Sequence, residues 1–384
     1  MCFMRTDKTC LLVFEDGDIY QGTHFGHDGE SCGELVFNTA MSGYQEVLTD
    51  PSYRGQVVLM TYPLIGNTGI NEEDVESDAC YLSGFVIREL SPIVSNQRAT
   101  TDLSSWLAER EIVGLQGVDT RAIVRKVRTH GSMRCIISSI DEDPASLVTK
   151  VEAWRGIHGH DIVQEVTRKE IVPWSTGLSE EKFLPNLERV GETRPRLAVM
   201  DFGVKHNMLR GLHEVGFDVT VFPAQTTADV VKEHAPDCLF LSNGPGDPEP
   251  LQYAVDTIRT LTEGGLPTFG ICLGHQLTAL ALGGKTAKMK FGHHGTNQPV
   301  IDLTTERTEI TSQNHSYVVD ASTLDMGKVE ITHENLNDRT VEGLRHRDLP
   351  LFTVQYHPEA APGPWDAFYL FRRFMDMVQP AASK

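Results

Sequence analysis

The sequence predicts an α/β protein: a β-rich N-terminal α/β domain followed by a domain with a mostly parallel central sheet. With 384 residues, the chain is long enough for two hydrophobic cores. Short apolar runs dominate residues 1–150, whereas from residue 196 apolar runs alternate with amphipathic ones. Residues 151–192 are more charged and contain two prolines, so we expect them to connect the domains. The predicted domains are therefore 1–192, with the connecting segment 151–192 included, and 193–380.

In the first domain, glycine-punctuated apolar runs predict strands over residues 11–14, 57–60 and 85–87. Residues 103–110 and 120–128 have a helical pattern, with Ser, Thr or Asp nearby to cap each start.

In the second domain, strands and helices alternate along the chain. Strands are predicted over 197–200, 219–222, 238–241, 266–269 and 351–356, and helices over 205–214, 227–234 and 252–262. This alternation predicts a parallel sheet covered on both faces. Residues 308–311 and 328–332 look like antiparallel strands added to that sheet.

The most specific chemical signal is the run Gly-Ile-Cys-Leu-Gly-His-Gln from Gly270 to Gln276. An apolar run precedes it and another follows, which predicts a strand, a sharp turn and a helix with Cys272 at the apex. The spacing matches the Gly-x-Ser-x-Gly nucleophile elbow, with a thiol in place of the hydroxyl. A helix N-terminus favours the thiolate form. We interpret Cys272 as a nucleophile rather than as a small buried core residue.

A nucleophilic cysteine needs a base, and the base needs an orienting group. The run His357-Pro358-Glu359 directly follows the predicted strand 351–356. In an open α/β sheet, reactive groups gather at the carboxyl ends of strands, where Cys272 is also expected. We therefore interpret His357 as the base and Glu359 as the group that orients it.

A glycine-rich loop, Ser-Asn-Gly-Pro-Gly-Asp-Pro over residues 242–248, follows the predicted strand 238–241. It presents backbone N–H groups in the manner of anion-binding loops. Because it lacks a Gly-Lys-Ser/Thr ending, it is not interpreted as a nucleotide-binding loop.

The elbow, the His-Pro-Glu run and the glycine-rich loop together resemble the class I glutamine amidotransferases, over roughly residues 193–380. The resemblance implies that Cys272 forms a γ-glutamyl thioester and that the backbone N–H groups of Leu273 and Gly244 stabilise the oxyanion. It also implies contacts to glutamine at Ser52, Gly244, Gly246, Leu273, Gln276, Asn314, Ser316 and Tyr317. The family commonly has Gly-Phe where this chain has Ser316-Tyr317. Lys205, His293 and His294 are interpreted as structural.

The N-terminal half decides among the amidotransferases. Residues 33–53, residues 61–67 and the run Gly-Val-Asp-Thr-Arg at 117–121 are similar to the small-subunit family of carbamoyl-phosphate synthetases. This resemblance implies a separate large subunit that uses ATP, bicarbonate and a divalent metal. That subunit would receive ammonia and make carbamoyl phosphate for arginine and pyrimidine synthesis. The resemblance is also compatible with a higher oligomer of heterodimers. No cofactor or metal is expected in this chain.

Two other readings remain open. One is a different amidotransferase, such as an anthranilate or GMP synthase glutaminase, against which residues 33–67 weigh. The other is a non-catalytic scaffold, against which the intact Cys272, His357 and Glu359 weigh.

Composition limits the partners and the compartment. A net charge of −19 and a pI near 5.2 argue against nucleic-acid and anionic-membrane surfaces. No run approaches the ~18 apolar residues of a membrane span, and the start resembles neither a signal nor a transit peptide. The seven cysteines are scattered without a Cys-x-x-Cys pair, which favours neither zinc nor a dithiol. A reducing cytoplasm is the expected setting.

Overall fold

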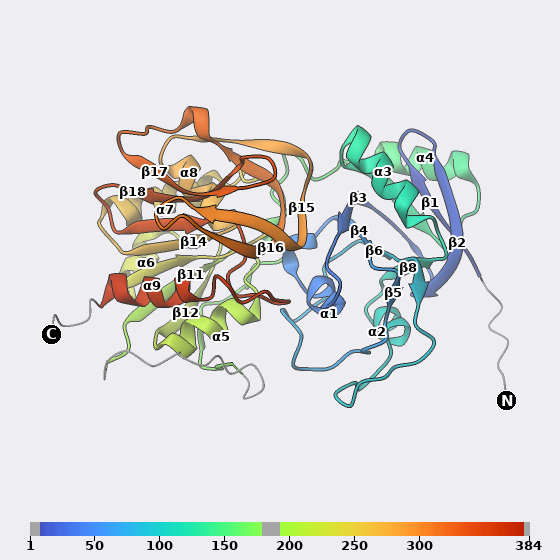
Figure 1. Cartoon of the computed structure of the whole chain (residues 1–384), viewed down its shortest axis with the longest axis horizontal. Helices are drawn as coiled ribbons and strands as arrows, with labels where there is room; N and C mark the ends of the chain where they lie inside the picture. Colours follow the sequence, from blue (N-terminus) through green and yellow to red (C-terminus); the bar gives the residue numbers. More distant parts are fainter. Residues whose placement is uncertain (1–7, 179–192, 380–384) are drawn as a thin grey trace. The chain divides into compact units, whose positions relative to one another are not determined.

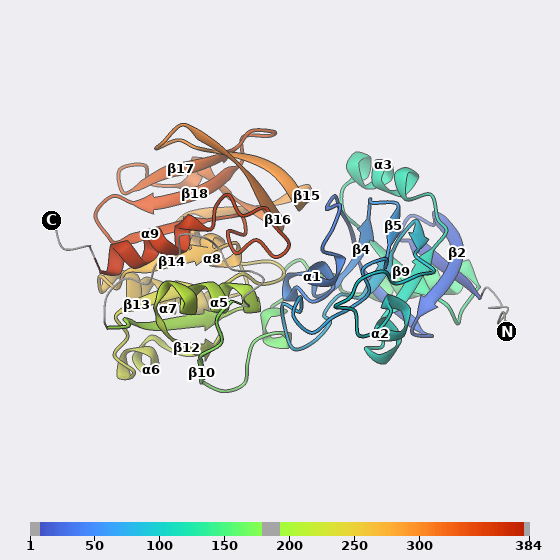
Figure 2. The ribbon, with the colours of Figure 1, turned by 60° about the horizontal axis from the view of Figure 1, so that its bottom comes forward.

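The computed structural model describes residues 8–178 and 193–379 (Figures 1 and 2). The chain forms two compact units, residues 8–157 with 290–294 and residues 158–289 with 295–379. The predicted domain boundary at residue 192 lies outside the described residues. Among the described residues, no helix combines the length and the apolar character needed to cross a membrane.

The first unit is built on a closed seven-stranded barrel. Its strands follow one another in the order β1 (Thr9–Phe14), β2 (Ile19–Gly26), β8 (Val113–Gln116), β6 (Gly84–Val86), β4 (Gln56–Met60), β3 (Glu30–Asn38) and β9 (Met133–Ser138). Alternate residues of β4 enter different cores, Val57 and Leu59 on one face and Val58 and Met60 on the other. The predicted β-rich character of this half is confirmed.

Most α-helices that the structure describes in the first unit begin after an aspartate cap. The helices of this unit are α1 (Tyr44–Leu48), α2 (Leu103–Glu109), α3 (Thr120–His130) and α4 (Pro144–Ala153), with the short 3₁₀ turn η1 (Pro51–Tyr53) and a two-stranded pair, β5 (Leu64–Ile65) and β7 (Glu89–Leu90). Asp102 and Asp119 each accept a hydrogen bond from a first-turn N–H, in α2 and α3 respectively. Both predicted helices are confirmed.

The second unit contains a ten-stranded sheet. The order is β10 (Val172–Trp174), β12 (Asp218–Pro223), β11 (Arg196–Asp201), β13 (Cys238–Leu241), β14 (Thr268–Ile271), β19 (Leu351–Val354), β18 (Val341–His346), β17 (Val329–Asn335), β15 (Lys285–Asp302) and β16 (Arg307–Asp320). The five strands from β12 to β19 are parallel to one another. Strands β18 and β17 extend them in antiparallel pairing, and β10 adds an antiparallel edge. The predicted mostly parallel sheet is confirmed.

Helices cover both faces of this sheet. On one face lie α5 (His206–Val215) and α9 (Tyr369–Val378), and on the other α6 (Ala228–Glu233), α7 (Gln252–Glu263) and α8 (Leu273–Ala281) (Figures 1 and 2). In β11, Leu197 and Val199 pack in the core beneath α5 and α9. Ala198 and Met200 pack in the core on the other face, beneath α6, α7 and α8. Each fully buried large apolar side chain contributes roughly 1.5–3 kcal/mol to this packing.

Two strand ends differ from the prediction. β14 begins at Thr268 rather than at residue 266, because Pro267 has no N–H to donate to the ladder, although its carbonyl accepts from Leu239. β19 ends at Val354 rather than at residue 356. Past that point the backbone N–H of His357 donates to Ser312 of β16 at 2.9 Å, so the chain leaves its ladder and turns.

The parallel strands deliver the predicted site residues to one edge of the sheet. Carboxyl ends of parallel strands lie at the same edge, and the segments that follow β11, β13, β14 and β19 begin at residues 202, 242, 272 and 355. This edge therefore brings together the loops that carry Lys205, Gly244, Cys272 and His357.

Candidate active site

Cys272 occupies a strained turn between β14 and α8. Its backbone has φ 55° and ψ −105°, outside the regions that side chains readily adopt. The two glycines of the motif are required by close approach: a Cβ on Gly274 would lie 2.3 Å from the Leu241 carbonyl oxygen, and one on Gly270 would lie 3.0 Å from the Gly274 backbone. The predicted strand, turn and helix are thus present, with the thiol at the helix start.

The thiol of Cys272 is buried beside β16. Its side chain is 1% exposed, and its Sγ lies 3.7 Å from the carbonyl oxygen of Asn314, to which it donates. Its backbone N–H donates to Val354 of β19 at 2.9 Å, which fixes the turn against the strand leading to His357. Asn314 is thereby placed beside the nucleophile. Its contact to glutamine stays a prediction.

His357 is held by Glu359 and faces the thiol. Its Nδ1 lies 2.8 Å from Oε1 of Glu359, while among the described residues its buried Nε2 has no hydrogen-bond partner. Burial by itself would lower the pKa of His357, but the Glu359 carboxylate and the nearby Cys272 outweigh it and raise that pKa to about 10. A raised pKa makes the imidazole a stronger base for a thiol proton.

Glu359 is fully buried and is kept ionised by a lysine. The Nζ of Lys205 donates to Glu359 Oε1 at 2.7 Å and to the Ala361 carbonyl at 2.9 Å, and Asn207 Nδ2 donates to the Glu359 carbonyl at 2.5 Å. Burial would raise the pKa of Glu359, yet Lys205 first and His357 second lower it to about 2. The interpretation of Lys205 as structural therefore misses a direct contact to the predicted triad.

Replacing Lys205 by methionine is expected to lower kcat/KM for glutamine hydrolysis by roughly 10- to 100-fold, about 1.4–2.7 kcal/mol of barrier. Without the cation, the pKa of buried Glu359 rises, so this carboxyl is protonated at higher pH. The acid limb of the pH–rate profile should then move to higher pH. Lys205→Arg, which retains the charge, should largely restore the profile, and Lys169→Met on the surface should leave it unchanged. An unshifted acid limb in Lys205→Met would contradict the role.

Two backbone N–H groups were predicted to form an oxyanion hole, those of Gly244 and Leu273. In the parts of the chain that the structure describes, the N–H groups of Gly244 and Leu273 donate to no protein acceptor. The two residues are close, since a Cβ on Gly244 would lie 2.7 Å from Leu273 Cδ2 and 2.2 Å from the Phe202 carbonyl oxygen. Only glycine fits there. Paired donors next to a nucleophile are what a tetrahedral oxyanion requires.

Gln276 ties α8 to β16 on the same side as the nucleophile. Its Nε2 donates to the Tyr317 carbonyl at 2.8 Å and to Gln355 Oε1 at 3.1 Å, so both amide hydrogens are engaged. Asn314, Ser316 and Tyr317 all belong to β16. Ser316 and Tyr317 replace the Gly-Phe that is common in the family. Both lie within a regular strand, whose extended backbone does not require glycine.

His158 fastens the glycine-rich loop to β16. Its Nδ1 lies 2.7 Å from Asp247 Oδ2 and 3.1 Å from Tyr317 Oη, and its ring stacks on Tyr317 with centroids 6.3 Å apart. The N–H of Gly159 also donates to Asp247 Oδ2, at 3.0 Å. Gly246, next to Asp247, has φ +86°, a conformation that favours glycine. The loop and the strand predicted to contact glutamine are thus cross-linked by one histidine.

Three residues that the sequence singled out lie in the first unit: Ser52, predicted to contact glutamine, and His293 and His294, interpreted as structural. Ser52 is in η1, 5% exposed, and its N–H donates to Asp50 Oδ1 at 2.9 Å. Its contact to glutamine stays a prediction. His293 and His294 also belong to the first unit, where the ring of His294 lies 6.0 Å from that of Tyr53.

Sequence reasoning missed His158, Asp247 and Asn207, and undervalued Lys205. A signal existed for Lys205, because it follows β11 at the same sheet edge as the glycine-rich loop. For His158 there was none: it lies more than 80 residues before either of its partners, in the segment interpreted as a connection.

Comparison with known proteins agrees with this geometry. Residues 198–377 match the family "Glutamine amidotransferase class-I", and residues 12–137 match "Carbamoyl-phosphate synthase small chain, CPSase domain". Proteins named carbamoyl phosphate synthase small chain are similar over nearly the whole chain. The one from Syntrophotalea carbinolica is 55% identical over 96% of this chain and 97% of its own length. Those from Rhodopirellula baltica and Aquifex aeolicus are 50% and 49% identical, each over 97% of this chain and over 96% and 99% of their own lengths.

Proposed function

The chain belongs to the family of carbamoyl phosphate synthase small chains, and from this membership and the site geometry we propose that it releases ammonia from glutamine through a Cys272 thioester. The observation that carries the proposal is the buried array of Cys272, His357 and Glu359 at the ends of β14 and β19. An amidotransferase of another kind is disfavoured, because residues 12–137 match the small-chain domain. A degenerate scaffold is disfavoured by the complete array.

In the first half-reaction, His357 Nε2 takes the thiol proton and Sγ of Cys272 bonds to the carboxamide carbon of glutamine. The carbonyl electron pair moves to oxygen, where the N–H groups of Gly244 and Leu273 stabilise it, at about 3 kcal/mol per donor. The pair then re-forms the carbonyl, the C–N bond breaks, and the imidazolium gives its proton to the departing ammonia.

In the second half-reaction, water attacks the thioester and gives a proton to His357. The C–S bond breaks, glutamate leaves, and the Cys272 sulfur regains its proton from the imidazolium. Glu359 holds the ring in place and stabilises its positive charge in both halves. Lys205 keeps Glu359 ionised for this purpose.

Glutamine recognition is proposed at Gly244, Gly246, Leu273, Gln276 and the 314–317 stretch of β16, with Ser52 as a further contact by resemblance. Because both amide hydrogens of Gln276 are engaged within the protein, its Oε1 is the side-chain group that would accept a hydrogen bond from the substrate.

Replacing His158 by alanine is expected to raise KM for glutamine about fivefold, near 1 kcal/mol for a lost hydrogen-bonded cross-link, with kcat little changed. The reason is that the glycine-rich loop and β16 lose their shared anchor while the triad keeps its own. Steady-state glutaminase kinetics measure the split. His160→Ala, two residues away, is the matched control. A fall in kcat with an unchanged KM would contradict the positioning role.

The ammonia is proposed to pass to a separate large chain that uses ATP, bicarbonate and a divalent metal to make carbamoyl phosphate for arginine and pyrimidine synthesis. The sequence contains no complete Gly-x-x-x-x-Gly-Lys-Ser/Thr nucleotide loop, because Ala279 stands where the run Gly284-Lys285-Thr286 would need its first glycine. This supports a division of labour between two chains. Assembly into an oligomer of heterodimers is part of this proposal. A reducing cytoplasm is supported by six unpaired cysteines among the described residues.

The proposal is tested by co-expressing the chain with the large chain encoded in the same genome. Carbamoyl phosphate formation is then measured with glutamine or with ammonium as nitrogen donor. We expect both donors to work with the complex and only ammonium to work with the large chain alone. Glutamine use by the large chain alone, or no glutamine use by the complex, would overturn the proposal.

A further inference from the structure

A cavity of about 520 Å³ opens in the second unit beside α9, and we call it the α9 pocket. It lies where β19 begins, at residues 349–352, and β14 begins beside it, since Thr268 pairs with Leu351. Cys272 and His357 follow the opposite ends of these two strands. The α9 pocket is therefore separate from the catalytic array.

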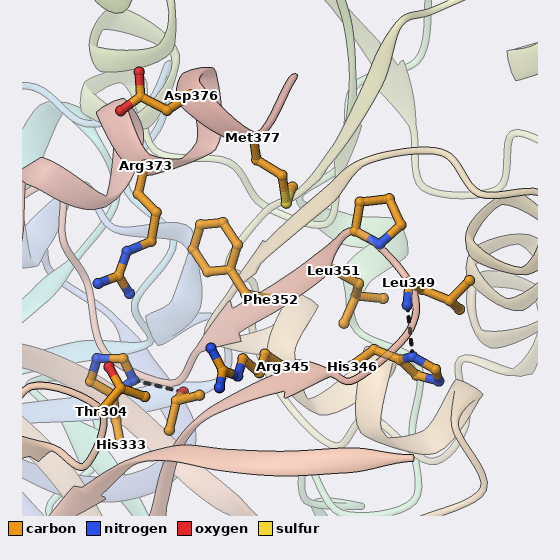
Figure 3. Close-up of a pocket in the computed structure, with 12 residues that line it drawn as sticks. Thr304, His333, Arg345, His346, Leu349, Leu351, Phe352, Arg373, Asp376 and Met377 are labelled. Carbon is orange, nitrogen blue, oxygen red and sulfur yellow. Dashed lines mark hydrogen bonds between the residues drawn. The ribbon is translucent and has the colours of Figure 1, made fainter. Parts of the chain in front are cut away.

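One wall of the pocket offers an aromatic face. The ring of Phe352 stacks on that of Phe269, with centroids 4.4 Å apart and planes at 22°. Phe269 is fully buried, whereas Phe352 is only partly buried and lines the cavity. Leu349, Leu351 and Met377 complete the apolar lining (Figure 3). A flat apolar group can stack here much as Phe269 does on the other side.

The other end of the pocket is polar and carries a cation, Arg373, that is ion-paired but not hydrogen-bonded within the described residues. Figure 3 shows Arg373 on the side of Thr304 and His333, away from Leu349. Among the residues that the structure describes, the Arg373 guanidinium donates no hydrogen bond: its nearest acidic atom, Asp302 Oδ2, is 3.8 Å away, and its side chain is 39% exposed. Its other neighbour is the ring of Tyr369, 5.3 Å from Cζ to centroid.

Two other charged side chains that line the pocket already have partners of opposite charge. Arg345 makes a bidentate contact to Glu330: its Nε donates to Oε2 and its Nη2 to Oε1, each at 3.0 Å. Asp376 accepts from Arg372 at 3.0 Å. Arg373 is thus the cation with donors to spare, and a guanidinium suits a planar carboxylate or a phosphate.

A second polar group at this end is the imidazole of His333. His333 is 2% exposed and its Nδ1 lies 2.9 Å from Thr332 Oγ1. Within the described part of the chain its Nε2 forms no hydrogen bond, and Asp302 Oδ2 lies 3.9 Å from it. Burial lowers the pKa of His333 to about 4, so the ring is neutral near pH 7. This end of the pocket therefore presents a neutral ring nitrogen beside the Arg373 guanidinium.

We propose that the α9 pocket binds a small planar anion, with its ring against Phe352 and its acidic group on Arg373. Carboxylates and phosphates share the chemistry that Arg373 recognises, and the apolar lining selects those attached to an aromatic ring. Polar and apolar features converge in one concave site, as ligand pockets require.

The test uses the full chain and three naphthalene probes in calorimetric titrations: 2-naphthoate, 2-naphthyl phosphate and the neutral 2-naphthamide. We expect at least one anion to bind about tenfold or more tightly than the amide. Arg373→Met should reduce the affinity for that anion to the affinity measured for the amide. Phe352→Leu should lower the affinity for all three probes. Lys232→Met, which removes an exposed cation on α6 that does not line the pocket, is the control and should change nothing. Comparison of the two anions distinguishes a carboxylate site from a phosphate site.

A second measurement locates binding in the unmodified chain, with one variant used only to assign a signal. The ¹³C-methyl signal of Met377, assigned with Met377→Leu, should shift on titration with the anion and not with saturating glutamine. Equal affinity for anion and amide, an unchanged affinity in Arg373→Met, or an unmoved Met377 signal would each overturn the proposal. Competition between the anion and glutamine would also overturn it, because the anion would then occupy the catalytic site.

Discussion

Replacing Cys272 by serine is expected to abolish glutamine-dependent carbamoyl phosphate synthesis, by roughly 10⁴-fold or more, as removal of a catalytic nucleophile does elsewhere. The hydroxyl fits the strained elbow but is far less acidic than the thiol, so the array around His357 has no adequate nucleophile to activate. Synthesis from ammonium by the same complex should be preserved. Paired assays with the two nitrogen donors measure this separation.

The matched control is Cys32→Ser, which changes a half-buried cysteine of the first unit and should leave both activities intact. Retained glutaminase activity in Cys272→Ser would contradict the nucleophile assignment. Loss of both activities would instead show that Cys272 is needed for assembly with the large chain, and size-exclusion chromatography of the complex would reveal it.

Replacing His357 by asparagine should lower kcat for glutamine by roughly 10³-fold or more, because one ring carries protons in both half-reactions. Glu359→Gln should cost less, since Glu359 orients the ring and stabilises its charge without transferring a proton. Glu359 also raises the pKa of His357, so in Glu359→Gln that pKa falls and the imidazole becomes a weaker base. Single-turnover release of ammonia, measured across pH, separates the two variants.

His234→Asn, on the exposed end of α6, is the control for a histidine outside the site and should behave as the unmodified chain. A pH–rate profile left unchanged by His357→Asn would contradict the role of His357 as the base. A larger fall in kcat for glutamine in Glu359→Gln than in His357→Asn would contradict the assignment of His357 as the residue that transfers the protons.

The site also shows how the buried charges support one another. Lys205, Glu359 and His357 form a continuous buried chain of a cation, a carboxylate and an imidazole, with contacts of 2.7 and 2.8 Å. Each member stabilises the ionised form of its neighbour, which burial alone would oppose. Removing Lys205 therefore changes the basicity of His357 through Glu359, while the Cys272 thiol itself is left in place.

Local sequence determined the elements and the reactive groups of this protein. The Gly-x-Cys-x-Gly run specifies its own turn, because only glycine tolerates the close approaches at Gly270 and Gly274. The alternation of apolar and amphipathic runs predicted the parallel sheet, and a parallel sheet brings the residues after β14 and β19 to one edge. Such features depend on a few neighbouring residues, and a pattern can express them.

Tertiary structure alone decided which distant side chains meet. Lys205 pairs with Glu359 across 154 positions, and His158 reaches Tyr317 across 159. The α9 pocket likewise arises where Phe352, Arg373 and His333 converge from three elements. No short-range period encodes these contacts, because they follow from the order of strands in the sheet and from the turn at which each strand ends.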